Sequence, residues 1–233
     1  DKIMGTLKGK IAFITGTSQG IGAAIARDLI DAGCHVCMHY FRSPEEPERL
    51  KSVAIERGQK ATCLHADLTK EAEVLRCIKE AVTAFGSFDV LVNNSGALVE
   101  RRAISALDLA YWAKLIDINL TSMMLVTKEI LPYLNKDGSS IVNLSSLAGR
   151  KGGHPGSLVY STTKGAVLTW TRSLSAELAH LGIRVNTVAP GFIEGTSFHE
   201  THTSPKSASA TIAGIPLGRS GRPEDVARAV TFL

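Results

Sequence analysis

The sequence has little of what marks membrane, disulfide-rich or disordered proteins. Aromatic residues make up 6% of its 233 residues, and it contains eight prolines and four cysteines. No apolar run approaches the roughly 18 residues that a membrane-spanning helix needs, and residues 1–10 contain no apolar signal stretch. A content of 44% hydrophobic and 21% charged residues is instead typical of a globular protein. We expect one cytoplasmic domain that spans residues 1–233 and has no membrane partner.

An excess of charge of one sign is also missing. The formal net charge of +4 comes from scattered lysines and arginines rather than from a basic stripe. The sequence therefore gives no electrostatic reason to expect a nucleic-acid partner.

The few cysteines and histidines do not predict a disulfide or a metal site. Cys34 and Cys37 have C-x-x-C spacing, but they lie in an apolar run with strand character, where positions three apart point to opposite faces. Buried thiols are the favoured interpretation. His199 and His202 have a ligand-like spacing, yet no further ligand pattern accompanies them in their segment, which is rich in Ser and Thr. A solvated loop is favoured there, and no metal is predicted.

Short apolar or β-branched runs alternate with longer amphipathic segments, which is the pattern of parallel βαβ units. The predicted strands are Ile11–Thr15, His35–His39, Ala61–Leu64, Val90–Val92, Ile141–Leu144 and Arg184–Val188. The predicted helices cover residues 20–32, 45–57, 70–85, 108–134 and 159–181, and another begins near Pro223. This pattern predicts an α/β fold, a Rossmann-type doubly wound parallel sheet in three layers.

The least regular part of the sequence is residues 195–214, which is rich in Ser, Thr, His and Ala. We interpret it as an insertion that lies over another part of the molecule. A mobile lid and an ordinary surface loop both remain open.

A glycine-rich turn follows the first predicted strand and opens the first helix. Its glycines permit a tight turn, close approach of the backbone to a pyrophosphate and close packing of helix on strand, while the helix N-terminus offers N–H groups to the anion. Because the turn lies between a strand and a helix, dinucleotide binding is favoured over an ordinary turn. The residues expected at the cofactor are Gly16, Ser18, Gln19, Gly20, Ile21 and Gly22.

Five motifs in register resemble the short, single-domain branch of the short-chain dehydrogenase/reductase family, and within it Pro190-Gly191-Phe192-Ile193-Glu194 and Gly218-Arg219 resemble the 3-oxoacyl carrier-protein reductases. The motifs are the T-G-x-x-x-G-I-G turn at 15–22, Asn93-Asn94-Ser95-Gly96, Ser145-Ser146, Tyr160-Ser161-Thr162-Thr163-Lys164 and Pro190-Gly191. The resemblance covers nearly the whole chain. It implies a nicotinamide-dependent oxidoreductase acting on a carbonyl or an alcohol.

Tyr160 and Lys164 are four residues apart on a predicted helix, so both side chains project from one face. An ammonium group beside a phenol favours the phenolate, and we expect it to lower the tyrosine pKa toward the working pH of a general acid–base. Tyr160 is therefore the expected proton donor to the carbonyl oxygen.

The other catalytic assignments rest on the resemblance. Ser146 is expected to hold the substrate carbonyl, and it is preferred to Ser145 because Leu147-Ala148-Gly149 follows it. Asn119, inside the predicted 108–134 helix, resembles the family's proton-relay asparagine, although an ordinary polar helix residue is the alternative. Lys164 and Tyr160 also count among the cofactor contacts, together with Asp67, Leu68, Asn93, Asn94, Gly96, Pro190, Gly191 and Ile193.

The end of the second strand bears on the choice of cofactor. NAD enzymes place a carboxylate there to accept from the ribose 2′-OH, whereas here Tyr40 holds that position, followed by Arg42 and Ser43. An arginine can pair with a 2′-phosphate. The sequence therefore favours NADP(H) over NAD(H), with a solvated loop charge as the alternative for Arg42.

The sequence also departs from the family. Gly195 precedes Thr196 as though one residue were inserted, which puts the expected cofactor contact of Thr196 in doubt. The sequence ends at Leu233, inside an expected helix, so the resemblance implies that the C-terminal end of the family fold is missing. Apolar residues of the 108–134 and 159–181 helices still predict a homo-oligomer, a tetramer or a dimer.

Three hypotheses differ in what the protein acts on: a free small molecule, a carrier-bound group, or no substrate at all. The positions that are basic in carrier-protein reductases hold Asp137 and Leu181 here, which favours a free small-molecule carbonyl or alcohol over a carrier-bound 3-oxoacyl group. Docking through Arg101, Arg102 and Arg150 is the alternative. A dinucleotide-sensing Rossmann module would need no catalytic set. The expected pocket lining is Leu98, Leu147, His154, Phe192 and Phe198.

Overall fold

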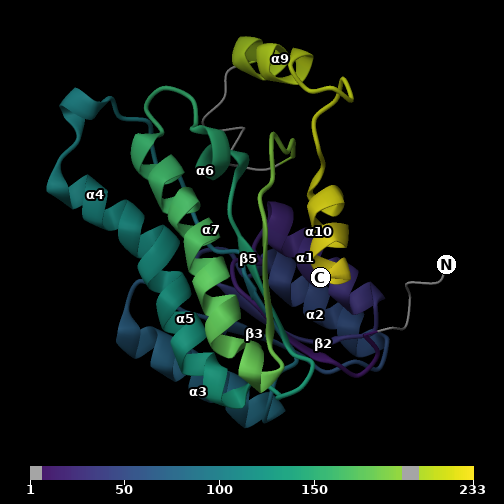
Figure 1. Ribbon diagram of the computed structural model, residues 1–233. Coiled ribbons are helices and arrows are strands. Elements are labelled where there is room, and N and C mark those ends of the chain that lie inside the picture. Colours follow the sequence, from purple (N-terminus) through teal and green to yellow (C-terminus); the bar gives the residue numbers. More distant parts are fainter. Residues whose placement is uncertain (1–6, 196–204) are drawn as a thin grey trace.

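The computed structural model of the protein describes residues 7–195 and 205–233 (Figure 1). Within them, six strands form one parallel sheet in the order β3-β2-β1-β4-β5-β6. The chain passes from β1 outward to β2 and β3 and then crosses back to β4, so the order reverses between β1 and β4. Ligands bind at the carboxyl ends of strands beside such a reversal. The strands are β1 (Ile11–Ile14), β2 (His35–Tyr40), β3 (Ala61–His65), β4 (Val90–Asn93), β5 (Ser140–Leu144) and β6 (Arg184–Val188).

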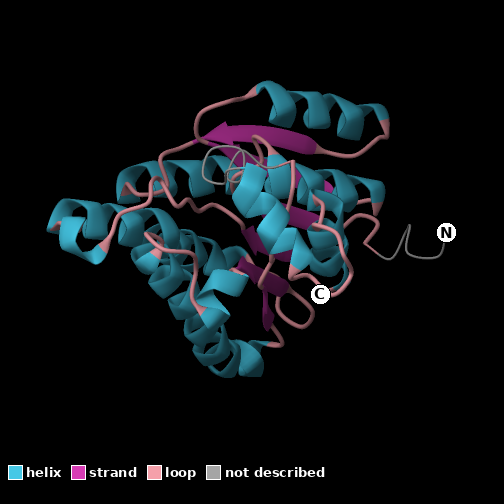
Figure 2. Ribbon diagram, turned by 90° about the horizontal axis from the view of Figure 1, so that it is seen from above, coloured by secondary structure: helices cyan, strands magenta, loops and turns pink. Residues whose placement is uncertain are grey.

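Helices cover both faces of the sheet, which gives three layers (Figures 1 and 2). One face carries α1 (Gly20–Asp31), α2 (Glu45–Glu56) and α10 (Pro223–Phe232), and the other carries α3 (Glu71–Phe85), α5 (Ser122–Ile130) and α7 (Leu158–Leu178). The remaining helices are α4 (Leu109–Ile116), α6 (Leu147–Lys151) and α9 (Pro205–Ala213). The expected doubly wound α/β fold is confirmed. Among the described residues, no helix has the length and apolar character needed to cross a membrane.

The two-residue period of the strands divides the core between the two faces. Ala12 and Ile14 belong to the core under α1 and α10, whereas Phe13 belongs to the core under α3, α5 and α7. Cys34 and Cys37 are divided in the same way, as their spacing predicted. Both are free, buried thiols, and burial raises the pKa of Cys34 to about 12.

The structure differs from the predicted elements in three places. The expected 108–134 helix is α4 and α5 separated by a π-helical turn, Asp117–Thr121, and it ends in a 3-10 turn, Leu131–Tyr133. Helix α6 was not predicted because its five residues are too few for an apolar period. Helix α9 was not predicted within residues 195–214, where Ser and Ala dominate. Strand ends differ by one residue, as at β2, which extends to Tyr40.

Candidate active site

A cleft of about 1890 Å³ lies along the carboxyl ends of the strands. Pockets for drug-sized ligands have volumes of about 300–1,000 Å³, so this cleft has room for an extended ligand and a second molecule. Residues that follow each of the six strands line it. They include Gly16 after β1, Arg42 after β2, Asp67 after β3, Asn94 after β4, Ser146 after β5 and Pro190 after β6.

The glycine-rich turn between β1 and α1 forms one end of the cleft. Gly16 and Gly20 have φ angles of 72° and 55°, a region that favours glycine. A Cβ on Gly22 would lie 2.0 Å from the Gly16 carbonyl oxygen, so α1 can pack against the turn only with glycine there. The N-cap residue Gln19 makes no side-chain capping bond. These features fit the pyrophosphate of a dinucleotide at the N-terminus of α1.

His39 supports the glycine-rich turn, a role that the sequence analysis missed. Its Nδ1 accepts from the Gly16 N–H at 3.2 Å, and its Nε2 lies 2.9 Å from the Ala66 carbonyl oxygen. Burial lowers the pKa of His39 to about 4, so the ring is neutral and Nε2 donates. The backbone oxygen of His39 also accepts from the N–H and the hydroxyl of Thr17. The only sequence signal was a polar residue in a buried strand.

Asn94 joins the turn to the loop after β4. Its Nδ2 donates to the carbonyl oxygens of Thr15 and Gly16 at 3.0 and 2.9 Å, and the Thr15 hydroxyl accepts from the N–H groups of Asn94 and Ser95. Asn93 is different. Its side chain, 5% exposed, lies in the core and donates to Thr127 and Asn143. Because neighbouring residues at a strand end point to opposite sides, Asn94 lines the cleft and Asn93 does not.

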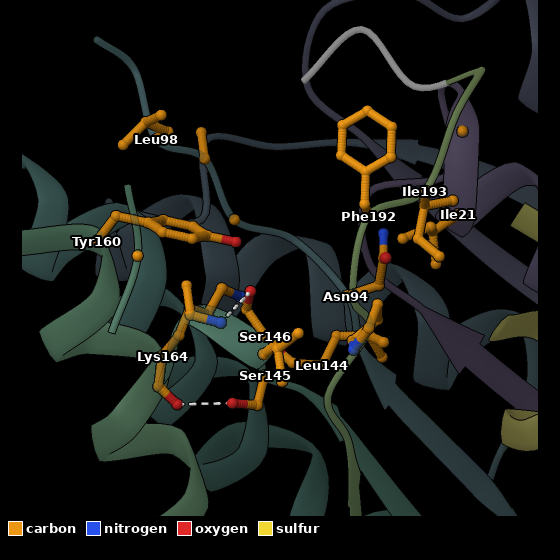
Figure 3. Close-up of a pocket in the computed structure, with 18 of the residues that line it drawn as sticks. Ile21, Asn94, Leu98, Leu144, Ser145, Ser146, Tyr160, Lys164, Phe192 and Ile193 are labelled. Atoms are coloured by element: carbon orange, nitrogen blue, oxygen red, sulfur yellow. Dashed lines mark hydrogen bonds between the residues drawn. The ribbon is translucent and has the colours of Figure 1, made fainter. Parts of the chain in front are cut away.

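Ser146, Tyr160 and Lys164 meet on the opposite side of the cleft (Figure 3). The Tyr160 phenol points into the cleft, and Lys164 lies one turn further along α7 with its Nζ 5.9 Å from the centre of the Tyr160 ring. The Lys164 Nζ donates to the Leu144 carbonyl oxygen at 2.8 Å. Ser146 is the N-cap of α6 and accepts from the Ala148 N–H at 3.1 Å.

The two adjacent serines have different partners. Ser145 is buried, and its hydroxyl donates to the Lys164 carbonyl oxygen at 2.6 Å, which ties β5 to α7. The Ser146 side chain instead accepts from the Ala148 N–H and lies near enough to Tyr160 to lower the pKa of its phenol. This difference in partners supports Ser146 as the residue beside the reacting group.

Burial sets the proton affinities of Tyr160 and Lys164. It raises the pKa of Tyr160, although the hydrogen bond with Ser146 acts in the opposite direction. It lowers the pKa of Lys164 to about 8. The expectation that Lys164 would lower the tyrosine pKa does not describe this arrangement. The reason is that both groups lose solvent, which disfavours the charge on each.

Asn119 lies in the π-helical turn between α4 and α5 and is 1% exposed. Its Oδ1 accepts from the Ala97 N–H, and its Nδ2 donates to the carbonyl oxygens of Ala97 and Leu115. The side chain therefore does not line the cleft. It flanks Gly96 together with Lys164: a Cβ on Gly96 would lie 2.7 Å from the Asn119 Oδ1 and 3.0 Å from the Lys164 Nζ.

The end of β2 corrects the expected position of one cofactor residue. The Tyr40 ring packs beside the His65 ring, with 5.5 Å between their centres, and Tyr40 is not part of the cleft lining. Phe41, Arg42 and Ser43 line the cleft instead. The reason is that β2 extends through Tyr40, so the loop that faces a ligand begins one residue later.

Most of the other predicted residues line the same cleft. From the cofactor set these are Ser18, Gln19, Ile21, Asp67, Leu68, Pro190, Gly191 and Ile193, and from the substrate pocket Leu98, Leu147, His154 and Phe192. Thr196, Phe198, His199 and His202 lie outside the described residues. Helix α9 contributes Ser207, Ala210 and Thr211 to the lining, so this part of the 195–214 segment is a wall of the cleft.

Asp137 lies at the far end of the sheet from the cleft. Its N–H donates to the Leu181 carbonyl oxygen, and the Gly138 N–H donates to that of Gly182, just before β5 and β6 begin. The cleft lies where those strands end. Within one subunit, a carboxylate at Asp137 is therefore not beside the mouth of the cleft.

Comparison with known proteins agrees with this geometry. A family model described as enoyl-(acyl carrier protein) reductase matches residues 16–233. An uncharacterized oxidoreductase of Methylorubrum extorquens is 39% identical, covering 99% of this chain and 92% of that protein. A 3-oxoacyl-[acyl-carrier-protein] reductase of Synechocystis is 35% identical, covering 99% of this chain and 91% of that protein.

Solved structures share the fold over nearly the whole chain. A dehydrogenase/reductase from Sinorhizobium meliloti has a TM-score of 0.91 at 29% identity and covers 99% of this chain and 89% of its own. An NADH-dependent reductase, A1-R′, responsible for alginate metabolism has a TM-score of 0.87 at 31% identity and covers 97% of this chain and 89% of its own. A short-chain dehydrogenase from Burkholderia cenocepacia in complex with NADP has a TM-score of 0.90 at 29% identity and covers 97% of this chain and 90% of its own. The chain belongs to the short-chain dehydrogenase/reductase family and is an NAD(P)-dependent oxidoreductase.

Proposed function

We propose that the protein catalyses NADP(H)-dependent reduction of a small carbonyl compound, or the reverse oxidation of the alcohol, with Tyr160 as the general acid–base. The observation that carries the proposal is that Ser146, Tyr160 and Lys164 line the same cleft as the glycine-rich turn. A nicotinamide cofactor supplies hydride chemistry when bound. A protein that only sensed a dinucleotide would not need the three catalytic side chains.

The chain's own residues have separate roles in this proposal. The Ser146 hydroxyl and the Tyr160 phenol, which line the same cleft, hold the carbonyl oxygen, and the phenol gives it a proton. Lys164, fixed to the Leu144 carbonyl oxygen, lies behind the tyrosine and binds the cofactor. Asn119 holds the Ala97 backbone and the π-helical turn, which fixes the loop beside Gly96. A proton relay through Asn119 remains part of the proposal.

Arg42 supports NADP(H) over NAD(H). It lines the cleft at the end of β2, and the adjacent Ser43 accepts through its carbonyl oxygen from the Ser18 hydroxyl of the glycine-rich turn at 2.9 Å. A 2′-phosphate beside this turn would meet a guanidinium rather than a carboxylate from β2. The similar proteins of known structure include one described as NADH-dependent and one bound to NADP, so the cofactor must be measured here.

We predict that Arg42→Ala weakens NADPH binding about tenfold or more and leaves NADH binding within about twofold, because charge-assisted hydrogen bonds to phosphate are strong. Titration of the cofactor's fluorescence with both reduced cofactors measures the two affinities. Equal weakening of both would remove the argument for NADP(H).

The activity itself is tested by the loss of absorbance of the reduced nicotinamide when the protein is offered a panel of ketones and aldehydes. Alcohols with the oxidised cofactor test the reverse direction. Turnover of at least one carbonyl compound is expected. Tight cofactor binding without any turnover would favour the dinucleotide-sensing alternative.

A carrier-bound 3-oxoacyl group is a second candidate substrate. The 35% identical Synechocystis reductase supports it, and the position of Asp137 away from the cleft removes the repulsion expected from the sequence. The test compares a 3-oxoacyl group on the carrier protein with the same group on a short thiol mimic, at low and high salt. A large, salt-sensitive preference for the carrier-bound form would favour this substrate over a free carbonyl compound.

We also propose a cytoplasmic homo-oligomer, a tetramer or a dimer. Exposed apolar side chains on α4 and at the start of α7 support a subunit interface there: Leu109 is 86% exposed, Trp112 41% and Leu158 50%. Light scattering after size-exclusion chromatography measures the mass, and a monomer would contradict the proposal.

A further inference from the structure

The part of the cleft that holds Ser146, Tyr160 and Lys164 is called the catalytic end. The cleft also carries basic side chains that the proposed reaction does not use. Lys114 on α4, Lys151 at the end of α6 and Arg101 in the loop after β4 all line the cleft. They come from three segments that are distant in the sequence. Their position on one cleft is therefore produced by the fold and not by a local run of basic residues.

Helix packing brings Lys114 to the Tyr160 end of the cleft. Leu115, the next residue after Lys114, packs against Val159, the residue before Tyr160. Ile118, one helical turn after Lys114, also lines the cleft. Lys114 and Ile118 therefore face the same side, since both line the cleft.

Lys151 and Arg101 reach the same end through the loop between α6 and α7. Gly153, two residues after Lys151, lies so close to α7 that a Cβ on it would be 2.6 Å from the Ser161 Oγ, next to Tyr160. The Arg101 Nη1 donates to the Pro155 carbonyl oxygen of this loop at 3.3 Å. Lys151 and Arg101 therefore adjoin the loop that packs against the start of α7, the helix that carries Tyr160.

Within the part of the chain that the structure describes, the carboxylates of the cleft pair with cations other than Lys114 and Lys151. The carboxylates that line the cleft are Asp67 after β3 and Asp225 on α10. Asp67 accepts from Thr69 and lies 3.4 Å from the Lys70 Nζ, and Asp225 lies 3.1 Å from the Arg219 Nη1. Lys114 and Lys151 form no ion pair with any described residue, although other lysines do, such as Lys10 with Asp89 at 3.0 Å.

The cofactor does not account for these cations. Its phosphates fit the glycine-rich turn and Arg42, which lie at the β1 and β2 ends of the cleft, whereas the three cations belong to segments that pack around the start of α7. A cleft lined by one sign of charge concentrates field lines and attracts ligands of the opposite sign.

We infer that the substrate is a small carbonyl compound that carries a carboxylate or a phosphate group, which Lys114 and Lys151, with Arg101, bind at the catalytic end of the cleft. The inference rests on the proposed function and names its substrate class. The anionic group would hold the substrate so that its carbonyl faces Tyr160 and Ser146, and removal of the charge would lower the rate of productive binding.

The test compares carbonyl compounds that differ in one charged group. The pairs are acetoacetate with methyl acetoacetate, and dihydroxyacetone phosphate with dihydroxyacetone. For wild type, kcat/KM should be at least about tenfold higher for one or both anionic members, and high salt should reduce this preference. Lys114→Gln and Lys151→Gln should each lower kcat/KM for that anion about threefold and together about tenfold, with the neutral partner within about twofold.

Lys79→Gln is the matched control, because Lys79 is an exposed lysine of α3 that is not part of the cleft lining and forms no ion pair with a described residue. Lys79→Gln should leave kcat/KM unchanged for both the anionic and the neutral substrate. Preference for the neutral members, turnover of neither anion, or a preference that survives the double lysine variant would overturn the inference. Activity on neutral carbonyl compounds alone would still leave the proposed function standing. Activity on a carrier-bound 3-oxoacyl group alone would also overturn the inference, because the three cations would then not bind a small anionic substrate.

Discussion

At the scale of single residues, hydrogen-bond partners decide which of two similar neighbours is functional. Ser145 and Ser146 are neighbours in the sequence, and so are Asn93 and Asn94, but the fold gives each of the four side chains different partners. Asn93 turns into the core and the Ser145 hydroxyl bonds the backbone of α7, whereas Asn94 lines the cleft and the Ser146 hydroxyl caps α6. The residues after Ser146 were enough to prefer it to Ser145, but the sequence placed both Asn93 and Asn94 at the cofactor, because separating them required the direction of each side chain.

The serine pair gives the first prediction. Ser146→Ala should lower kcat about a hundredfold, as expected for the loss of one oriented hydrogen bond to the reacting oxygen. Ser145→Ala should instead lower the free energy of unfolding by about 1 kcal/mol and change kcat only a few-fold, since it removes one buried hydrogen bond. Steady-state kinetics and urea denaturation of both variants measure these effects. The reverse pattern would transfer the catalytic role to Ser145.

His39 makes a pH-dependent contribution to stability. Its pKa is about 4 in the folded protein, against about 6.5 in an unfolded chain. Between these values the unfolded state binds more protons, so the stabilisation is fully present above pH 6.5 and is lost as the pH falls toward 4. The loss should reach about 3 kcal/mol.

His39→Asn removes the titrating group, so its free energy of unfolding should fall less than that of wild type between pH 6.5 and 4. Urea denaturation across this range measures both slopes. Equal slopes would show that the buried imidazole does not titrate as described.

At the scale of elements, the prediction was good where a segment is long and periodic and poor where it is short. The six strands and the long helices were predicted because their apolar residues repeat at the strand or helix period. The π-helical turn at Asp117–Thr121 was not predicted, because it interrupts a helix without changing the apolar pattern. Its Asn119 was singled out as an awkward helix residue, and that residue replaces a helical bond by donating to the Leu115 carbonyl oxygen.

The close approach at Gly96 provides a prediction at this scale, because Gly96 separates the π-helical turn from α7. Gly96→Ala would bring a Cβ to 2.7 Å from the Asn119 Oδ1 and 3.0 Å from the Lys164 Nζ, so both side chains must move. We expect kcat to fall at least about tenfold, because a small misplacement of catalytic groups is costly. Circular dichroism and the thermal midpoint check that the variant is folded. A folded variant with wild-type kcat would show that Lys164 and Asn119 tolerate displacement.

At the scale of the whole molecule, the fold explains why residues from six loops form one site. In a parallel sheet all the carboxyl ends lie on one edge, and the reversal between β1 and β4 opens the cleft there. The alternation of strands and helices was enough to predict this arrangement. It could not show that Asp137 lies at the opposite edge or that Lys114 and Lys151 line the same cleft, since both depend on how distant segments pack. That residues 1–233 form one domain stays a prediction.

The most direct test of the account is the effect of Tyr160→Phe on turnover and on cofactor affinity, measured on the same preparation. The substitution removes the phenolic proton and keeps the ring, so NADPH affinity should stay within about twofold while kcat falls at least about a hundredfold, the usual contribution of general acid–base catalysis. A variant that binds NADPH normally and retains most of its carbonyl reductase activity would contradict the central claim that Tyr160 is the proton donor.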